Sequence, residues 1–309
     1  MAASHRVDDT TRAKLLLALC GILWGVNWPL IKIGLTGLSP WSYRLIAFVV
    51  GAATLIGVVR LTGRRLFEPR GMTWLHLFAS SMLNVAAFGV FSTFAMLTAT
   101  TSRVAVVSYT FPVWACLLAW LVLGEKLRAG AVLGLVLCIC GLVVLITPVI
   151  DSSAMIGLSL SLASAMCWAV GTIYLKLVRI PGDMLVNTAW QIAMSAIVLL
   201  IVMAIFEGWP SFEPAPAGAL SAAIFNGLGT AVAYLLWYYV IGHLPATTAS
   251  LGSLMSPAVG VLSAVLILNE WPTAIDVTGF ALIFAAAVCA ILQPRERADP
   301  PMPEPEIRR

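Results

Sequence analysis

Side chains suited to holding a small polar solute lie inside the apolar runs of this sequence. Trp24 and Trp168 each lie near the middle of such a run, and Asn27 follows Trp24 by about one helical turn. An indole N–H in apolar surroundings needs an internal acceptor or a water-filled cavity. A buried amide can donate to a carboxylate and accept from an ammonium group, but it can equally join two helices. We expect Trp24, Trp168 and Asn27 to line a binding cavity, with helix packing as the alternative.

Three further stripes of polar and aromatic residues have helical spacing. They comprise Asn226, Thr230, Tyr234 and Trp237; Asn84, Phe88 and Phe91; and Ser161, Ser164, Trp168 and Thr172. Polar groups in an apolar environment cost free energy unless they are paired, so each stripe indicates either a lined cavity or hydrogen bonds between helices. We expect the first stripe to line a cavity and leave both readings open for the other two. Tyr109 is a further candidate, as a gate.

The sequence lacks the usual constellations of catalysis and metal binding. It contains no Gly-x-Ser-x-Gly, no His-Glu-x-x-His and no paired His or Asp inside an apolar run. We therefore predict no enzyme activity, no catalytic residue, no metal and no cofactor. The cysteines all lie in apolar runs without metal-ligating neighbours, so we interpret them as small packing residues; they are Cys20, Cys116, Cys138, Cys140, Cys167 and Cys289.

The composition tells us which solvent surrounds these residues. Of 309 residues, 61% are hydrophobic and only 10% are charged, and the mean hydropathy is +0.97. A soluble domain is nearer half apolar and a quarter charged. Too few polar residues remain to cover a surface in water, so lipid must be the partner of the outer surface. The formal net charge of +4 comes from residues between the apolar runs, and we predict no nucleic-acid partner.

Ten apolar runs are long enough to cross a bilayer, which needs about 20 residues per helix. They are 14–35, 41–60, 73–97, 104–123, 129–148, 155–177, 184–206, 216–241, 246–268 and 274–292. A backbone in lipid must satisfy its own hydrogen bonds, so the runs are predicted to be helices. The predicted fold class is an all-α integral membrane protein with ten transmembrane helices.

The charge pattern predicts the orientation. With a cytoplasmic N-terminus, most of the 18 Lys and Arg residues fall on the cytoplasmic side, and only Lys32, Arg44 and Arg103 lie at or near outer ends, as the positive-inside rule requires. Both termini are then cytoplasmic, with an N-terminal tail at 1–13, polar and disordered, and a disordered tail at 293–309. The expected location is the bacterial inner membrane.

Four charged residues at helix ends have less certain roles. We expect Lys32 and Arg44 to reach outward to the lipid headgroups. If they instead turn inward, they would meet a carboxylate at the outer mouth of the cavity. Glu125 and Glu270 are expected to cap helices or form surface ion pairs.

The two halves of the chain resemble each other. The matching segments are Trp24-Gly25-x₆-Lys32 with Trp168-Ala169-x₆-Lys176, Ser108-x₃-Pro112 with Ser253-x₃-Pro257, and Gly124-Glu125 with Asn269-Glu270, at an offset of 144 or 145 positions. Each repeat, 14–148 and 155–292, holds five spans. Because five is odd, the second copy crosses the membrane in the opposite sense. Inverted repeats are typical of secondary transporters, with the substrate site between the halves.

Three prolines inside the spans are predicted hinges, with simple packing kinks as the alternative. Pro29, Pro112 and Pro257 each remove a backbone hydrogen bond from a helix. Freed carbonyl groups near such kinks can bind polar groups or allow bending.

The repeats also resemble a known family. Trp24-Gly25-x-Asn27, the run Pro112…Gly124-Glu125…Gly134…Gly141 and its second copy Pro257…Asn269-Glu270…Gly279 look like EamA domains. The chain is thereby similar to the drug/metabolite transporter superfamily, with YddG-like exporters of aromatic and other neutral amino acids as the chosen analogue. The resemblance implies a ten-helix basket around a central cavity. The second copy departs from the pattern, with Asn269 and Ala286 in place of glycines.

These observations together predict a secondary transporter that exports small neutral or zwitterionic metabolites, with amino acids among them, by alternating access. No Asp or Glu lies in the middle of a span, so we expect facilitated diffusion, or coupling by a route the sequence does not reveal. Phosphorylated cargo would need several central cations, which are absent. Efflux of lipophilic or cationic drugs remains an alternative, as does a structural or assembly protein. The expected partners are a small-molecule substrate and membrane lipid, and a monomer suffices.

Overall fold

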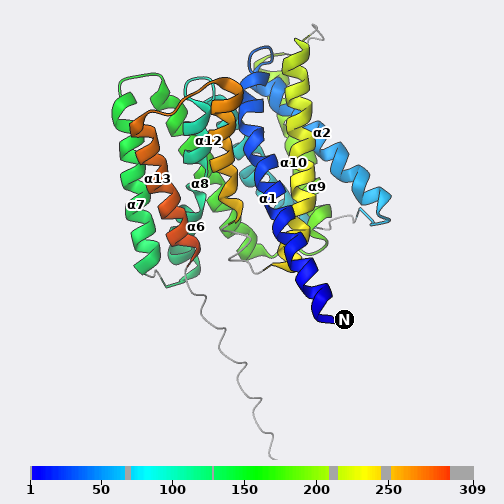
Figure 1. The fold of residues 1–309 in the computed structure, drawn as a ribbon. Helices are drawn as coiled ribbons and strands as arrows, with labels where there is room; N and C mark the ends of the chain where they lie inside the picture. The colour runs from blue at the N-terminus through cyan, green and yellow to red at the C-terminus, as the bar shows by residue number, and fades with distance from the viewer. Residues whose placement is uncertain (1, 67–70, 127–128, 209–214, 245–251, 293–309) are drawn as a thin grey trace, which may run out of the picture.

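A computed structural model describes residues 2–66, 71–126, 129–208, 215–244 and 252–292 of the chain. Every regular element in these ranges is helical. The helices stand side by side in one bundle, and the start of α1 and the end of α13 lie at the same end of it (Figure 1).

The first half of the chain contains five spans. These are α1 (Ala2–Gly34); α2 (Pro40–Leu61); α3 (Met72–Ser81) with the π-helical segment η1 (Met82–Ala87) and α4 (Phe88–Ala95); α5 (Thr101–Ser108) with α6 (Phe111–Leu123); and α7 (Ala129–Ile146), which ends in the short 3₁₀ turn η2 (Thr147–Val149). The second half contains α8 (Ala154–Val178), α9 (Met184–Phe206), α10 (Ala217–His243), α12 (Met255–Leu268) and α13 (Ala274–Ile291).

The predicted spans agree with these helices, with two differences. In the described ranges nine helices are long and apolar enough to cross a bilayer, and α12 is a shorter apolar helix; part of the ninth predicted span, 246–268, lies outside those ranges. The predicted disorder of the polar N-terminal tail is wrong, because α1 begins at Ala2 and runs through it. Nine span-length helices and the shorter α12 in the described ranges agree with the predicted ten-helix repeat fold.

The fourth span is interrupted before its proline. Helix α5 ends at Ser108, and α6 begins at Phe111 with Pro112 in its first turn, where a proline needs no backbone N–H. Pro257 likewise lies in the first turn of α12. By contrast, Pro29 lies inside α1 without ending the helix. The two repeat-related prolines therefore both lie at helix starts.

Helix packing follows the repeat. In the pairs α2–α9 and α7–α13 each helix contacts its own counterpart. Other large contacts occur in pairs that the repeat relates. Helix α1 packs on α10, and its counterpart α8 packs on α4 and η1, which correspond to α10. Helix α1 also packs on α12, and α8 packs on α5 and α6, which correspond to α12. Exchanging the two halves thus reproduces the contact pattern, which is the expected property of an inverted repeat.

Glycines of the repeat motif lie where α7 and α13 approach each other closely. A Cβ atom on Gly134 would lie 2.9 Å from the carbonyl oxygen of Ala286, and one on Gly141 would lie 3.0 Å from that of Gly279. Small residues let membrane helices pack backbone against backbone. The motif glycines of α7 therefore serve helix contact.

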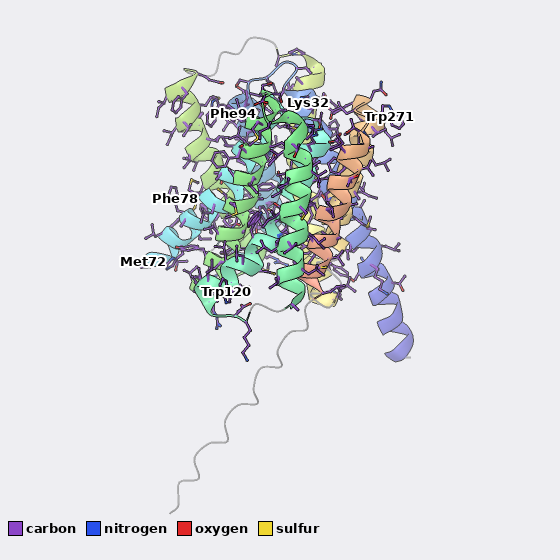
Figure 2. The ribbon with its side chains drawn as sticks, turned by 90° about the vertical axis from the view of Figure 1, so that its left-hand side faces the viewer. Lys32, Met72, Phe78, Phe94, Trp120 and Trp271 are labelled. Atoms are coloured by element: carbon purple, nitrogen blue, oxygen red, sulfur yellow. The ribbon has the colours of Figure 1, made fainter. Side chains whose placement is uncertain are left out.

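Apolar side chains cover the outside of the bundle. Among the labelled side chains, Met72, Phe78 and Trp120 project from its periphery (Figure 2) and are 62%, 43% and 44% exposed. An apolar surface of this extent is unstable in water but suits a lipid environment. The fold therefore supports the predicted integral membrane class.

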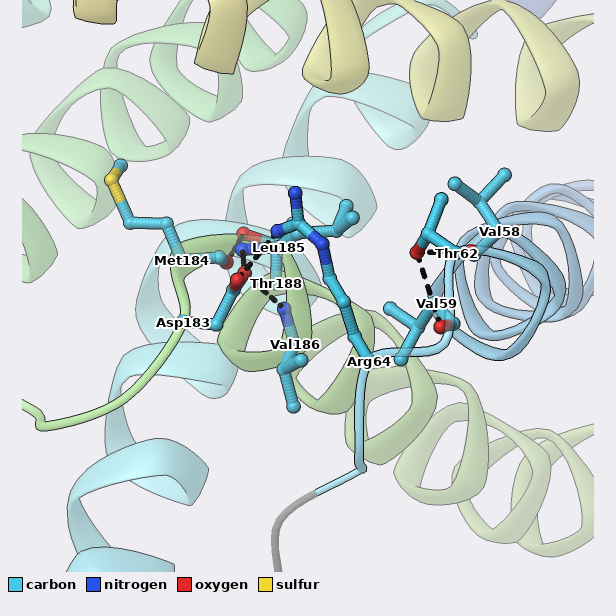
Figure 3. Close-up of polar contacts among 9 residues, drawn as sticks. All are labelled: Val58, Val59, Thr62, Arg64, Asp183, Met184, Leu185, Val186 and Thr188. Atoms are coloured by element: carbon cyan, nitrogen blue, oxygen red, sulfur yellow. Dashed lines mark hydrogen bonds and ion pairs between the residues drawn. The ribbon is translucent and has the colours of Figure 1, made fainter.

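Polar contacts between the halves are found at both ends of the bundle. Asp183 caps α9 by accepting from the backbone N–H groups of Leu185 and Val186, and it pairs with Arg64 after α2 (Figure 3). At the opposite end Glu270 accepts hydrogen bonds from the backbone N–H of Thr101, at 2.7 Å, and from its hydroxyl. Glu270 thus caps α5, and Glu125 pairs with the exposed Lys176. These roles agree with the expectation for both glutamates.

Candidate binding cavity

A cavity of about 410 Å³ lies inside the bundle. Its walls come from helices of both halves and are lined by Trp24, Asn27, Trp28, Ile31, Arg44, Ala47, Phe48, Gly51, Asn84, Val85, Phe88, Gly89, Ser92, Tyr109, Phe111, Pro112, Trp168, Ile192, Asn226, Thr230, Tyr234, Trp237, Ser253 and Ile291. The volume falls in the range of small-molecule sites, which combine apolar walls with a few placed polar groups.

Five aromatic side chains of the lining form a closed ring of contacts. Trp28 lies 6.4 Å from Phe88, Phe88 lies 4.9 Å from Trp168, and Trp168 lies 5.8 Å from Phe111, measured between ring centroids. Phe111 lies 5.7 Å from Tyr109, which returns to Trp28 at 6.2 Å. Most of these contacts are edge-to-face or tilted, the arrangements that aromatic pairs prefer. The ring joins α1, α4, α6 and α8, and therefore both repeats.

A second aromatic group lies between α1 and α10. Trp24 contacts Tyr234 at 5.9 Å and Trp237 at 5.6 Å between centroids. Trp24 and Trp168 are both half-buried. The two repeat-related tryptophans thus lie in separate aromatic walls of one cavity, each packed on the equivalent helix of the other half.

Amide groups bridge α1 and α10 at the cavity. The Asn27 side chain donates to the Thr230 hydroxyl at 3.0 Å, and Asn226 donates to the backbone carbonyl of Asn27 at 3.3 Å. These amides therefore combine both roles foreseen from the sequence, since they join two helices and also line the cavity. Gly229 leaves room for the bridge, because a Cβ atom there would lie 3.1 Å from Asn27 Oδ1.

Asn84 differs from the other amides because its Nδ2 group is buried and has no hydrogen-bond partner in the described chain. It lies in the π-helical segment η1 and is 7% exposed. Such segments often mark functional sites. Its amide packs directly on α8, where a Cβ atom on Gly171 would lie 2.4 Å from Asn84 Oδ1. An unpaired buried donor costs free energy, so a ligand that accepts from Asn84 would gain affinity.

Ten of the eleven candidate residues from the sequence line the cavity, and so does one predicted hinge, Pro112. The exception is Thr172, whose hydroxyl donates to the carbonyl of Trp168 within the same helix. In the same stripe Ser164 forms a hydrogen bond with Ser108, so the interhelical alternative holds there. The candidate gate Tyr109 donates to the Ser256 hydroxyl at 2.7 Å, which joins the halves.

The expectation that Arg44 reaches outward to the headgroups is wrong. Arg44 is only 7% exposed and lines the cavity, because its position on α2 turns it toward α4 rather than toward lipid. Lys32 also turns inward, donating to the carbonyl of Met96 at 2.7 Å. The sequence reasoning missed Trp28, Phe48, Ser92 and Phe111 as lining residues, although Trp28 lies one turn from Trp24 and could have been found by that spacing.

The lining allows selective non-covalent binding. Among the described lining residues the only charged side chain is that of Arg44, and the part of the chain that the structure describes holds no group of three His, Cys, Asp or Glu side chains that could bind a metal ion. Aromatic faces, amides and hydroxyls suit a solute with an apolar part and a few polar groups.

Comparison with known proteins points in the same direction. The profile of the EamA-like transporter family matches residues 11–147 and 155–292. An uncharacterized transporter of Bacillus subtilis, YoaV, is 25% identical over 276 residues, covering 87% of this chain and 94% of that protein. A probable amino-acid metabolite efflux pump of Escherichia coli is 26% identical over 285 residues, covering 87% and 91%. A crystal structure superposes with a TM-score of 0.63 at 21% identity, covering 91% of this chain and 96% of the other, which shows a shared fold.

Proposed function

The chain belongs to the EamA-like transporter family, and on this basis we propose that it exports small neutral or zwitterionic metabolites by alternating access. Amino acids with aromatic or other neutral side chains are the proposed cargo. The relative in Escherichia coli named as a probable amino-acid metabolite efflux pump supports this choice. The protein is a multi-pass membrane transporter; the cargo and the direction are our proposal.

One observation carries the proposal: a cavity between two inverted halves with aromatic and amide walls. The closed aromatic ring offers apolar faces to a side chain, and Asn27, Asn84 and Asn226 offer amides to polar groups. Two near-equal halves of opposite sense give two near-equal conformations, each opening the site to one side of the membrane. The repeat-related helix starts at Pro112 and Pro257 are the proposed hinges.

We place the protein in the bacterial inner membrane with both termini in the cytoplasm. The start of α1 and the end of α13 lie at the same end of the bundle (Figure 1), which fits an even number of crossings. The positive-inside rule then assigns that end to the cytoplasm. Cysteine or reporter tags at the two ends, probed from each side of the membrane, test the assignment, and opposite locations would contradict it.

The described residues of the lining include no carboxylate, which supports facilitated diffusion and speaks against the alternative of cationic drug efflux. A buried carboxylate is the usual means of coupling to protons inside a membrane. We also propose that the protein has no catalytic activity and that a monomer is sufficient for transport.

Transport into proteoliposomes tests the function. A panel of labelled aromatic, aliphatic and charged amino acids is offered to vesicles that contain the protein, with empty vesicles as the control. We expect flux of neutral amino acids that saturates with concentration and is unchanged by an imposed pH gradient. Absence of flux for the whole panel would contradict the cargo, and a strong dependence on the gradient would contradict facilitated diffusion.

A further inference from the structure

Arg44 is a buried cation in the first turns of α2. The residue is 7% exposed and lines the cavity. A Cβ atom on Gly89 of α4 would lie 3.2 Å from Arg44 Cδ, so the glycine makes room for the arginine. A charged side chain inside a membrane is costly and usually marks a functional site with a partner for the charge.

The protein partners of Arg44 are neutral. Its Nε donates to Thr93 Oγ1 at 2.8 Å, and its Nη2 donates to the hydroxyls of Thr93 and Ser92. Both hydroxyls donate their own hydrogen to the carbonyl of Gly89, at 2.8 and 3.0 Å. Their lone pairs are therefore free to accept from the guanidinium. Thr93 and Ser92 orient Arg44 but supply no negative charge.

No carboxylate of the described ranges balances Arg44. The ion pairs found there join Arg64 with Asp183, Arg103 with Asp276 and Lys176 with Glu125. The aromatic ring of Phe48, 5.6 Å from Arg44 Cζ, gives partial compensation. Nη1 makes no hydrogen bond within the described chain. The two N–H groups of Nη1 are therefore free to donate charge-assisted hydrogen bonds to a carboxylate.

The rest of the cavity lining favours an anion that carries a single negative charge on an apolar body. The other described lining residues are uncharged, and many are aromatic. A phosphate group would need several positive donors, whereas the lining offers one.

We propose that Arg44 binds a carboxylate of the transported solute and that the cargo consists of monocarboxylates with an apolar or aromatic body. This inference rests on the proposed transport function and redefines its cargo by the carboxylate, so that anions without an amino group are included beside the zwitterionic amino acids. Because no described lining residue carries an acidic side chain that could pair with an ammonium group, the amino group of an amino acid is dispensable for binding, whereas its carboxylate is required. Solutes that lack the carboxylate are poor ligands.

A matched set of probes tests the requirement. Phenylalanine, N-acetylphenylalanine, 3-phenylpropionate and phenylalaninamide share one aromatic body and differ in charge. Each competes with labelled phenylalanine for transport by the purified protein in proteoliposomes. We expect the three carboxylates to compete and the amide to compete at least 10-fold less well, since hydrogen bonds to charged groups contribute enough for roughly a 10- to 100-fold difference.

Variants then assign the effect to Arg44. Arg44→Gln is expected to remove the preference for the acids over the amide, and Arg44→Lys to keep part of it. Thr93→Val keeps the charge of Arg44 but removes a hydroxyl that orients its guanidinium, so the preference for the acids over the amide should fall without being lost. This variant also tests the role of Arg44 if Arg44→Gln fails to fold. Arg64→Gln, at an exposed arginine outside the cavity, is the matched control and keeps the wild-type preference.

The outcomes separate the two proposals. Equal competition by the acids and the amide in the wild-type protein would overturn the carboxylate inference while leaving transport intact. The carboxylate inference would also be overturned if folded Arg44→Gln protein kept the full preference for the acids over the amide, since Arg44 would then have a structural role only. Absence of phenylalanine flux together with flux of a carboxylate-free solute would overturn the inference alone. Absence of flux for every solute would contradict the proposed function itself.

Discussion

Substitution of Gly25 by alanine tests how closely the two halves pack beside the cavity. Gly25 lies on α1, next to Trp24, and faces α12 of the other half. A Cβ atom there would lie 2.6 Å from Cβ and Cγ1 of Val259 and 2.8 Å from the carbonyl oxygen of Ser256. The last contact is with backbone, so a side-chain rotation cannot relieve it, and α1 and α12 must separate.

The expected magnitude follows from these distances. Restoring ordinary contact requires a separation of roughly 1 Å, and overpacking of this kind typically costs about 1–3 kcal/mol. A helical Gly→Ala change also gains up to about 1 kcal/mol in helix propensity. Gly57→Ala is the matched control, because Gly57 lies inside α2 and a Cβ atom there meets nothing within 4 Å. The propensity gain cancels in the comparison, which leaves the steric cost.

Thermal unfolding in detergent or nanodiscs provides the assay. A loss of 1 kcal/mol of stability lowers the melting temperature by roughly 2–4 °C in chains somewhat shorter than this one. We therefore expect Gly25→Ala to melt several degrees below Gly57→Ala. Transport should also fall in Gly25→Ala, because the displaced helix carries Trp24 and Asn27. Equal melting temperatures for the two variants would refute the close contact of α1 and α12, and with it the described packing of the halves.

Substitutions at four further positions separate binding residues from structural ones. Trp168→Ala should strongly reduce flux of aromatic amino acids while Trp168→Phe keeps most of it, measured in proteoliposomes; unchanged flux in the alanine variant would remove Trp168 from the site. Thr172→Val should leave transport unchanged, because the Thr172 hydroxyl forms its hydrogen bond within α8; a large loss of flux would show that Thr172 takes part in substrate binding. Asn84→Ala should keep the melting temperature, since its Nδ2 has no partner in the described chain, yet weaken substrate affinity by about 2- to 10-fold; a clear loss of stability would indicate a structural role. Arg103→Met should destabilise the protein by about 3 kcal/mol, because it leaves the largely buried Asp276 without its ion pair, 2.6 Å long; an unchanged melting temperature would show that the pair contributes little.

The sequence alone was sufficient for the architecture. Span positions depend on local hydropathy, and the predicted run 184–206 coincides with α9 (Met184–Phe206). The repeat and its odd number of spans led to the inverted arrangement, because motif spacing is a property of the chain itself. Most lining residues were also accessible, since polar and aromatic residues at helical spacing inside a membrane span have few other uses.

Only the tertiary structure decided which partners those residues have. Arg44 lies near a helix end, from which a long cationic side chain is expected to reach the lipid headgroups, yet it donates hydrogen bonds to Thr93 and Ser92 of another helix and lines the cavity. Thr172 shares a helix face with Trp168 but bonds within α8, and Trp168 reaches its ring neighbours Phe88 and Phe111 from other spans. Helical periodicity determines which face a side chain occupies, whereas its partner depends on the rotation and proximity of helices far apart in the chain.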